Sequence, residues 1–170
     1  MTNTTQLQNS RQYLRSLKMV HTSLLIGMII FSVIVVVLMM TASVFEENAA
    51  SLHNIMKFFV PVVTIAAFLG SGVIFKKKID ALKQASGTSF RYRMEQYRTA
   101  CIMRWAMLEG AVMLALVAQL LTKNYYYSIF IFLLLIFFFL YAPSAEKIKT
   151  QLELGSQEQA ILDDEYGEWQ

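Results

Sequence analysis

Four long stretches with very few charged residues constrain the fold more than any other feature of this sequence. About 20 apolar residues in a helix span the hydrocarbon core of a bilayer, which is about 30 Å thick; the usual range is about 17–25 residues. A soluble alternative would require four apolar helices to shield one another within 170 residues, although helices that are apolar all round belong in a large core or in lipid. We therefore predict an all-α, four-transmembrane-helix bundle with spans at residues 19–40, 58–75, 102–121 and 125–141.

The composition agrees with a membrane protein. Hydrophobic residues make up 56% of the chain and charged residues 16%, whereas soluble domains average about 45–50% and about 25%. The single cysteine, Cys101, excludes an internal disulfide bond and a CxxC metal or redox motif. The first apolar stretch is longer than the roughly 7–15 residues of a signal-peptide core, so we expect it to be retained as a helix.

Lysine and arginine residues are distributed unevenly around the apolar stretches. Residues 1–18 contain three and the connection 76–101 contains seven, whereas the other two connections offer only Lys57 and Lys123. Because an excess of basic residues stays on the cytoplasmic side, we predict an N-in/C-in protein of the bacterial cytoplasmic (inner) membrane. Its parts would be a polar, basic cytoplasmic arm (1–18), a membrane domain (19–142) and a cytoplasmic helix with an acidic tail (143–170).

The middle connection is expected to be a helical elbow that joins two membrane hairpins. KKKIDALKQ continues the second span as a helix, SGTS at residues 86–89 breaks it with a glycine and capping residues, and FRYRMEQYRTACIMR leads into the third span. After Pro143, SAEKIKTQLEL predicts a short helix that ends at Gly155. The acidic segment that follows either extends freely into water or docks against the basic elbow.

The basic and aromatic residues near the span ends suggest contacts with lipid. The elbow charges either serve topology alone or contact anionic lipid headgroups at the cytoplasmic face, with about 1 kcal/mol per basic residue. Nucleic acid is not expected, because the basic stretch is short and held at the membrane. The headgroup candidates are Lys76, Lys77, Lys78, Arg91, Arg93 and Arg98; the interfacial anchors are Arg104, Trp105 and Tyr141 at the inner face and Tyr125, Tyr126 and Tyr127 at the outer face.

Glu109 is the main candidate for a functional residue, because it lies inside the third apolar stretch. A charge at the bilayer centre costs on the order of 2.5–3.5 kcal/mol on insertion scales, and such residues pair with something or face water. His21 lies at a similar predicted depth on the first span, so we expect a His21–Glu109 pair. Glu109 could form a structural hydrogen bond between helices, bind a proton or cation in a transport path, or contact a partner subunit or lipid.

Pairs of small residues one helical turn apart suggest where helices approach closely. They occur on three different stretches, which predicts an internally packed bundle. The fourth stretch, IFIFLLLIFFFL, has no small residue and is expected to face lipid or a neighbouring subunit, in a homo-oligomer or a membrane complex. The pairs are Ser23 with Gly27, Ala66 with Gly70, and Ala106 with Gly110.

The segment RWAMLEGAVMLALVAQLLT resembles a pattern found in small, uncharacterised four-helix membrane proteins of bacteria, which implies a fold and no activity. It also has a distant similarity to the ion-carrying helix of rotary ATPase proteolipid subunits, in which a membrane glutamate precedes small and aliphatic residues. That resemblance implies an ion-binding role for Glu109 alone. The chain departs from that family in its four spans, its long basic elbow and its few glycines.

No metal-ligand cluster, nucleophile–base pair or phosphate-binding loop is present in the sequence. We therefore expect no metal, no cofactor and no enzymatic activity. The predicted function is that of a small polytopic accessory or scaffolding subunit. The alternative is a component of a proton- or cation-linked transporter or channel organised around Glu109.

Overall fold

The structure is a computed structural model that describes residues 9–41, 49–84 and 88–164. It is all-helical, as predicted. Three helices, α1 (Ser10–Thr41), α2 (Ala49–Gln84) and α3 (Phe90–Thr122), are each long and apolar enough to cross a membrane. The rest of the described chain forms a 3₁₀ turn, η1 (Tyr125–Tyr127), and the helices α4 (Ser128–Leu140), α5 (Ala145–Leu152) and α6 (Ser156–Asp163).

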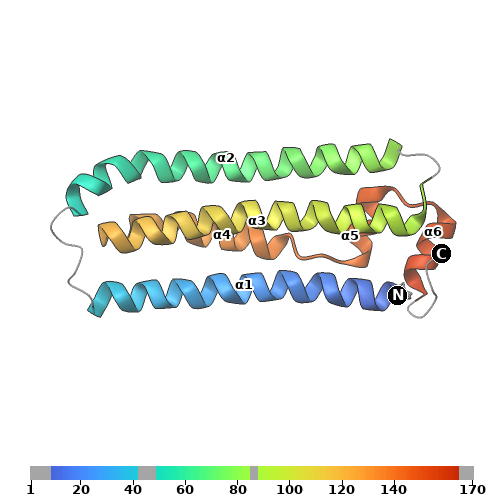
Figure 1. Cartoon of the computed structure of the whole chain (residues 1–170), viewed down its shortest axis with the longest axis horizontal. Coiled ribbons are helices and arrows are strands. Elements are labelled where there is room, and N and C mark those ends of the chain that lie inside the picture. Colours follow the sequence, from blue (N-terminus) through green and yellow to red (C-terminus); the bar gives the residue numbers. More distant parts are fainter. Residues whose placement is uncertain (1–8, 42–48, 85–87, 165–170) are drawn as a thin grey trace, which may run out of the picture.

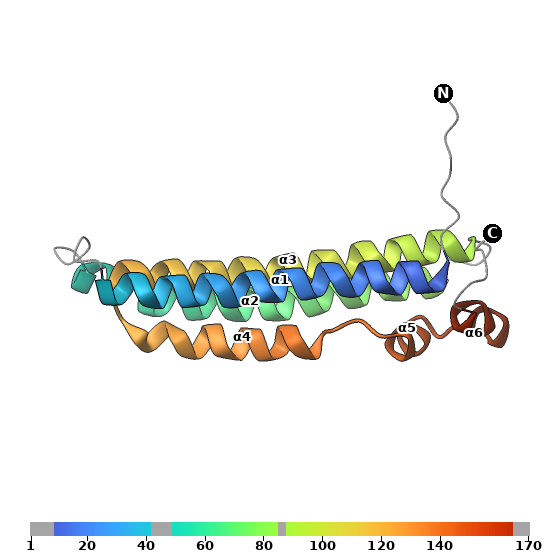
Figure 2. The same ribbon diagram turned by 90° about the horizontal axis from the view of Figure 1, so that it is seen from below.

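The three long helices lie side by side with α3 between α1 and α2, and α4 packs beneath this layer (Figures 1 and 2). The start of α1, the end of α2, the start of α3, and the helices α5 and α6 all lie at one end of the molecule (Figure 1). We call this the elbow end. The α3–η1 turn lies at the opposite end, so α1 and α3 run in one direction and α2 and α4 in the other.

The helix boundaries follow local sequence signals. α2 continues through the predicted elbow as far as Gln84, and α3 begins after Ser89, whose hydroxyl accepts a hydrogen bond from the Tyr92 amide. Such a side-chain cap satisfies one of the backbone donors left free at a helix start. Residues 85–87, which include part of the predicted SGTS break, lie outside the described residues. At the far end, Lys123 adopts the left-handed conformation that commonly ends a helix.

The fourth apolar stretch does not form one long helix. η1 and α4 together cover Tyr125–Leu140, which are 16 residues and reach about 24 Å at about 1.5 Å per residue. After Leu140 the chain leaves the helix, and α5 points away from the η1–α4 segment at an angle of 83°. Pro143 lies in this connection, where its missing N–H prevents continuation of the helix.

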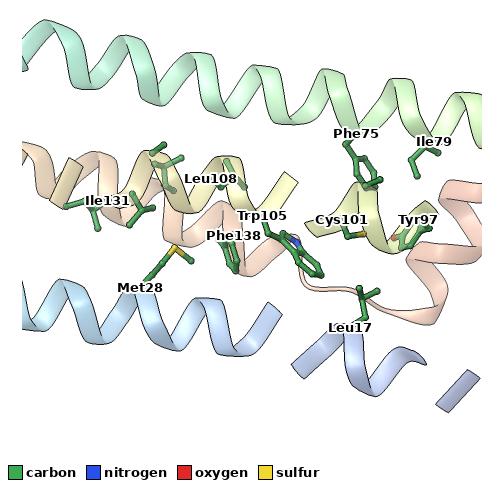
Figure 3. Close-up of a cluster of buried hydrophobic side chains, with 14 of the residues drawn as sticks. Leu17, Met28, Phe75, Ile79, Tyr97, Cys101, Trp105, Leu108, Ile131 and Phe138 are labelled. Carbon is green, nitrogen blue, oxygen red and sulfur yellow. The ribbon is translucent and has the colours of Figure 1, made fainter. Parts of the chain in front are cut away.

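The core is built around α3, because this helix contacts α1, α2 and α4 (Figure 1). Figure 3 shows Met28 of α1, Leu108 of α3, and Ile131 and Phe138 of α4 pointing into this shared interior. Leu108 is fully buried. The outer faces of α1 and α2 expose large apolar side chains instead, as helices in contact with lipid do; these include Ile30, Val33, Ile65 and Leu69.

The acidic segment after α5 does not extend freely, at least as far as Asp164. It forms α6, whose Glu158 pairs with Arg93 of α3, while Glu153 accepts a 2.6 Å hydrogen bond from Lys83 of α2. The Ser10 hydroxyl also donates to the Ile161 carbonyl at 2.8 Å. The interpretation as a free tail is therefore wrong for this part, and docking against the basic elbow is confirmed. Opposite charges on the two segments explain the attraction.

Candidate functional site

His21 is buried against two aromatic rings of α3 and α4. Its ring stacks on Phe138 with centroids 4.7 Å apart and meets Trp105 edge-on at 5.0 Å. Its Nε2 atom lies 2.9 Å from the Phe138 carbonyl, so Nε2 carries the proton and donates. His21 is buried, and the exit of α4 supplies the hydrogen-bond partner that burial requires.

Glu109 is half-buried on α3 and forms no hydrogen bond or ion pair with any residue of the described ranges. The predicted direct pair with His21 is therefore not formed: the histidine bonds to the α4 backbone instead. Trp105, one turn before Glu109 on the same helix, takes the place beside the histidine ring. A carboxylate in an apolar stretch thus has no partner within the described chain.

Two of the predicted interfacial anchors are core residues rather than surface residues. Trp105 is 1% exposed and Tyr127 is fully buried. The Tyr127 hydroxyl lies 3.0 Å from Nδ1 of His53 on α2, so it links two helices at the far end. Tyr125 and Tyr126 are exposed, as anchors would be. Large aromatic rings fit an interface with lipid and an interface between helices equally well, so composition does not separate the two environments.

The three predicted pairs of small residues lie mostly outside the core of the bundle. Only Gly70 meets a neighbour closely: a methyl group added to it would lie 3.2 Å from Cε of Met107 on α3. Gly27 and Gly110 have open space at the corresponding position. Five of the six paired residues are exposed, whereas other small residues of α3, among them Ala111, Ala115 and Ala118, are buried in the core. The outward residues are Ser23, Gly27, Ala66, Ala106 and Gly110.

Arg104 is held between aromatic rings at the level where α4 ends. Its guanidinium carbon lies 3.2 Å from the centroid of the Tyr141 ring and 4.8 Å from that of Phe75. Such stacking is favourable for a guanidinium cation. Its Nε atom is buried without a hydrogen-bond partner, and none of the described carboxylates pairs with it. Arg104 is therefore more than a surface anchor: it is a half-buried cation without a counter-charge in the described chain.

Arg104 lines a cavity of about 310 Å³ between α2, α3 and the α4–α5 connection. We call it the Arg104 cavity. Phe75, Tyr97, Cys101 and Trp105, four of its lining residues, lie close together in Figure 3. The other lining residues are Leu140, Tyr141, Ala142, Pro143, Lys147 and Gln151. The cavity thus has an aromatic wall, two cations and no carboxylate among its described lining residues.

Two side chains of α5 complete the polar part of this cavity. Lys147 Nζ donates to the carbonyls of Leu140 and Ala142 at 2.8 Å each, which places its charge beside the C-terminus of α4, where cations are favoured. Gln151 Oε1 accepts a 2.8 Å hydrogen bond from the Tyr97 hydroxyl. Burial raises the pKa of Tyr97, so this hydroxyl keeps its proton, and the orientation leaves the Gln151 amide nitrogen as a donor.

Sequence reasoning did not find Lys147 or Gln151 as site residues. They are four residues apart on α5, a spacing that puts two side chains on one helical face. That spacing was the only available signal, and it does not reveal that α5 folds back against α2 and α3. The 83° turn of the chain between α4 and α5 decides this placement, and the direction of such a turn depends on tertiary contacts.

The headgroup candidates divide into three groups. Lys76 and Lys77 are exposed on α2, as contact with lipid requires. Arg93 is used within the protein, because it pairs with Glu158 and donates to the Leu152 carbonyl. Arg91 forms an ion pair with Glu95 one turn along the same helix. The remaining candidates, Lys78 and Arg98, are half-buried.

The geometry described so far is that of an all-helical protein with three helices long and apolar enough to cross a membrane and a cationic, aromatic cavity at its elbow end. Within the described ranges, no group of three or more potential metal ligands comes together. Comparison with known proteins does not extend this description: the chain matches no family model, no curated protein sequence and no solved structure.

Proposed function

We propose that the chain is a non-enzymatic accessory or scaffolding subunit of the bacterial cytoplasmic membrane. The observation that carries this proposal is the apolar interior of the bundle. Between the level of His21 and the level of Gln119, the side chains that fill the shared core include Met28, Leu108 and Val112, each completely buried. A transport path would need polar groups or water along this length. The described buried residues there are mostly apolar, and the hydroxyl groups of Thr64 and Ser71 on α2 are the polar exceptions between those two levels.

We further propose an N-in/C-in topology with four spans, in which η1 and α4 form the fourth. Both described ends of the chain lie at the elbow end together with the basic connection (Figure 1). The positive-inside rule assigns such an end to the cytoplasm. The segment Tyr125–Leu140 is shorter than a usual span, and local thinning of the bilayer or tilting of its neighbours accommodates a short span at modest cost.

Self-association through α3 is the proposed mode of assembly. Ala106 and Gly110 lie one turn apart on a face of α3 that the described helices leave exposed, and Glu109 borders this face. Small residues allow two membrane helices to approach closely, and a carboxyl group there can hydrogen-bond across the interface. A second copy of the chain would offer Glu109 the partner that the described chain lacks.

The matched glycines Gly110 and Gly27 test this assembly, because both have open space around them. Gly110→Ile places a branched side chain on the proposed interface, whereas Gly27→Ile places one on the outer face of α1. We expect Gly110→Ile to shift the detergent-solubilised protein to a smaller species by light scattering, with no shift for Gly27→Ile. A monomeric wild-type protein, or equal behaviour of the two variants, would exclude self-association through this face.

A second candidate function, proton or cation movement at Glu109, is favoured by the lack of a partner for this carboxylate among the described residues. Proton flux into liposomes separates the two functions. The accessory role predicts the same low flux for the wild type and for Glu109→Gln. A wild-type flux well above that of protein-free liposomes, lost in Glu109→Gln, would replace the accessory role with transport.

A further inference from the structure

We propose that the Arg104 cavity binds a phosphate group, carried either by a phospholipid headgroup or by a free phosphate ion. This inference uses the membrane placement of the chain but is independent of its accessory role and of Glu109. The unusual feature is a guanidinium group whose charge no described carboxylate neutralises. Arg104 makes only ring contacts with described residues, and its Nε is buried without a partner.

The donor set of the cavity fits a phosphate group. The N–H groups of a guanidinium group lie in its own plane, so contact of its face with aromatic rings leaves them available. Two of them can bind two oxygens of one phosphate group. Lys147 Nζ already donates to two carbonyls, and an ammonium group has three donors. The Gln151 amide nitrogen provides a further donor, because its oxygen is engaged by Tyr97. Three side chains from α3 and α5 thus line one cavity with unused donors.

The size and position of the cavity also fit. A volume of about 310 Å³ lies at the lower end of the roughly 300–1,000 Å³ range of ligand sites, which suits a compact headgroup. The cavity lies where α4 ends and the basic elbow begins, at the depth expected for the cytoplasmic headgroup layer. Basic pockets between membrane helices on this side are suited to phosphate-bearing lipids. The bound phosphate would neutralise Arg104 and join α3 to α5.

The experiment uses the full chain purified in an uncharged maltoside detergent, which contains no phosphate. Thermal unfolding is followed while inorganic phosphate, phosphatidylglycerol or phosphatidic acid is added, with sodium chloride at matched ionic strength as the control. We expect a rise in Tm with at least one of the three phosphates and none with chloride. A response to the lipids alone identifies a headgroup site, and a response to inorganic phosphate identifies a site for the free ion.

Two variants assign the response to this cavity. Arg104→Gln removes the cation, and Gln151→Glu keeps the shape but places a carboxylate where Arg104 can pair with it. Each should weaken phosphate binding by roughly tenfold or more, because a hydrogen bond to a charged group typically changes an affinity by at least that factor. Lys18→Gln, which changes an exposed basic residue of α1 outside the cavity, should leave the affinity unchanged. No phosphate response in the wild type, or unchanged affinity in folded Gln151→Glu, would overturn the proposal.

Discussion

Arg93 of α3 and Glu158 of α6, 65 residues apart in the sequence, form an ion pair that fastens the C-terminal helix to the elbow end. Both side chains are largely shielded from water, with 14% and 27% of their surfaces exposed. Arg93 also donates to the Leu152 carbonyl at 3.3 Å. One arginine therefore contacts both the end of α5 and the start of α6, and it adds to the contacts that Ser10 and Lys83 make with the same segment.

Loss of this pair should release α6. We expect Arg93→Gln to destabilise the docked segment by about 1 kcal/mol, a typical contribution for a charged hydrogen bond that is partly exposed. Cleavage after Glu153 by a glutamate-specific protease should become several-fold faster at that energy, because such a difference changes the open population by roughly fivefold. Lys76→Gln should cleave like the wild type. The reversed pair Arg93→Glu with Glu158→Arg should recover part of the protection; equal cleavage of Arg93→Gln and wild type would contradict the docking role.

His21 should be important for the stability of the α1–α4 contact. Replacing it with alanine removes a buried ring that contacts Trp105 and Phe138, and large-to-small changes in a core cost about 2–5 kcal/mol. His21→Phe keeps the ring but removes the hydrogen bond to the Phe138 carbonyl, which contributes about 0.5–1.5 kcal/mol. The Tm should therefore decrease in the order wild type, His21→Phe, His21→Ala. A His21→Phe protein less stable than His21→Ala would show that the polar contact dominates.

Leu108 and Leu133 allow the interior of the protein to be compared with its exposed surface. Leu108 is completely buried on α3, whereas Leu133 of α4 is 46% exposed. We expect Leu108→Ala to cost about 2–5 kcal/mol because it leaves a cavity, and Leu133→Ala to stay within about 0.5 kcal/mol because it lies away from such features. Reversible unfolding in SDS–maltoside mixtures measures both. Similar costs would mean that α4 is covered on its outer side, for example by a second copy of the chain.

Cys101 should react slowly with alkylating reagents in the folded protein. Burial raises the pKa of its thiol from the ordinary 9.0 to about 12, and the thiolate is the reactive form. At pH 8 the thiolate fraction should be roughly a thousandfold lower than in the unfolded chain, since each pKa unit is a factor of ten. Because the folded state holds this proton more tightly, its contribution to stability is complete below about pH 9 and is lost as the pH rises toward 12. The maleimide labelling rate against pH, with an SDS-unfolded control, measures the shift; identical profiles in the two states would contradict it.

Local sequence patterns predicted the helices well. The apolar stretches at residues 19–40, 58–75 and 102–121 all lie within long helices, and the helical elbow and the cap at Ser89 follow the predicted signals. These features depend on neighbouring residues in the sequence and on the free energy of transferring a single helix from water to lipid. They need no knowledge of what a helix packs against.

The partners of individual side chains were predicted less well. His21 and Glu109 share a similar predicted depth, yet His21 bonds to α4 and Glu109 forms no hydrogen bond or ion pair with a described residue. Depth along a helix follows from residue number, but the direction of a side chain relative to its neighbours depends on how the helices rotate as they pack. The same rotation turns Gly110 outward and Trp105 inward.

The sequence by itself determined that these helices are apolar enough for lipid and that basic residues accumulate in the connection between the second and third helices. Both properties are sums over many residues. Only the tertiary structure decided that the chain turns by 83° after Leu140 and brings Lys147 and Gln151 into one cavity with Arg104. That juxtaposition depends on a few contacts between residues far apart in sequence. Each contributes little on its own, so no short pattern in the sequence records them.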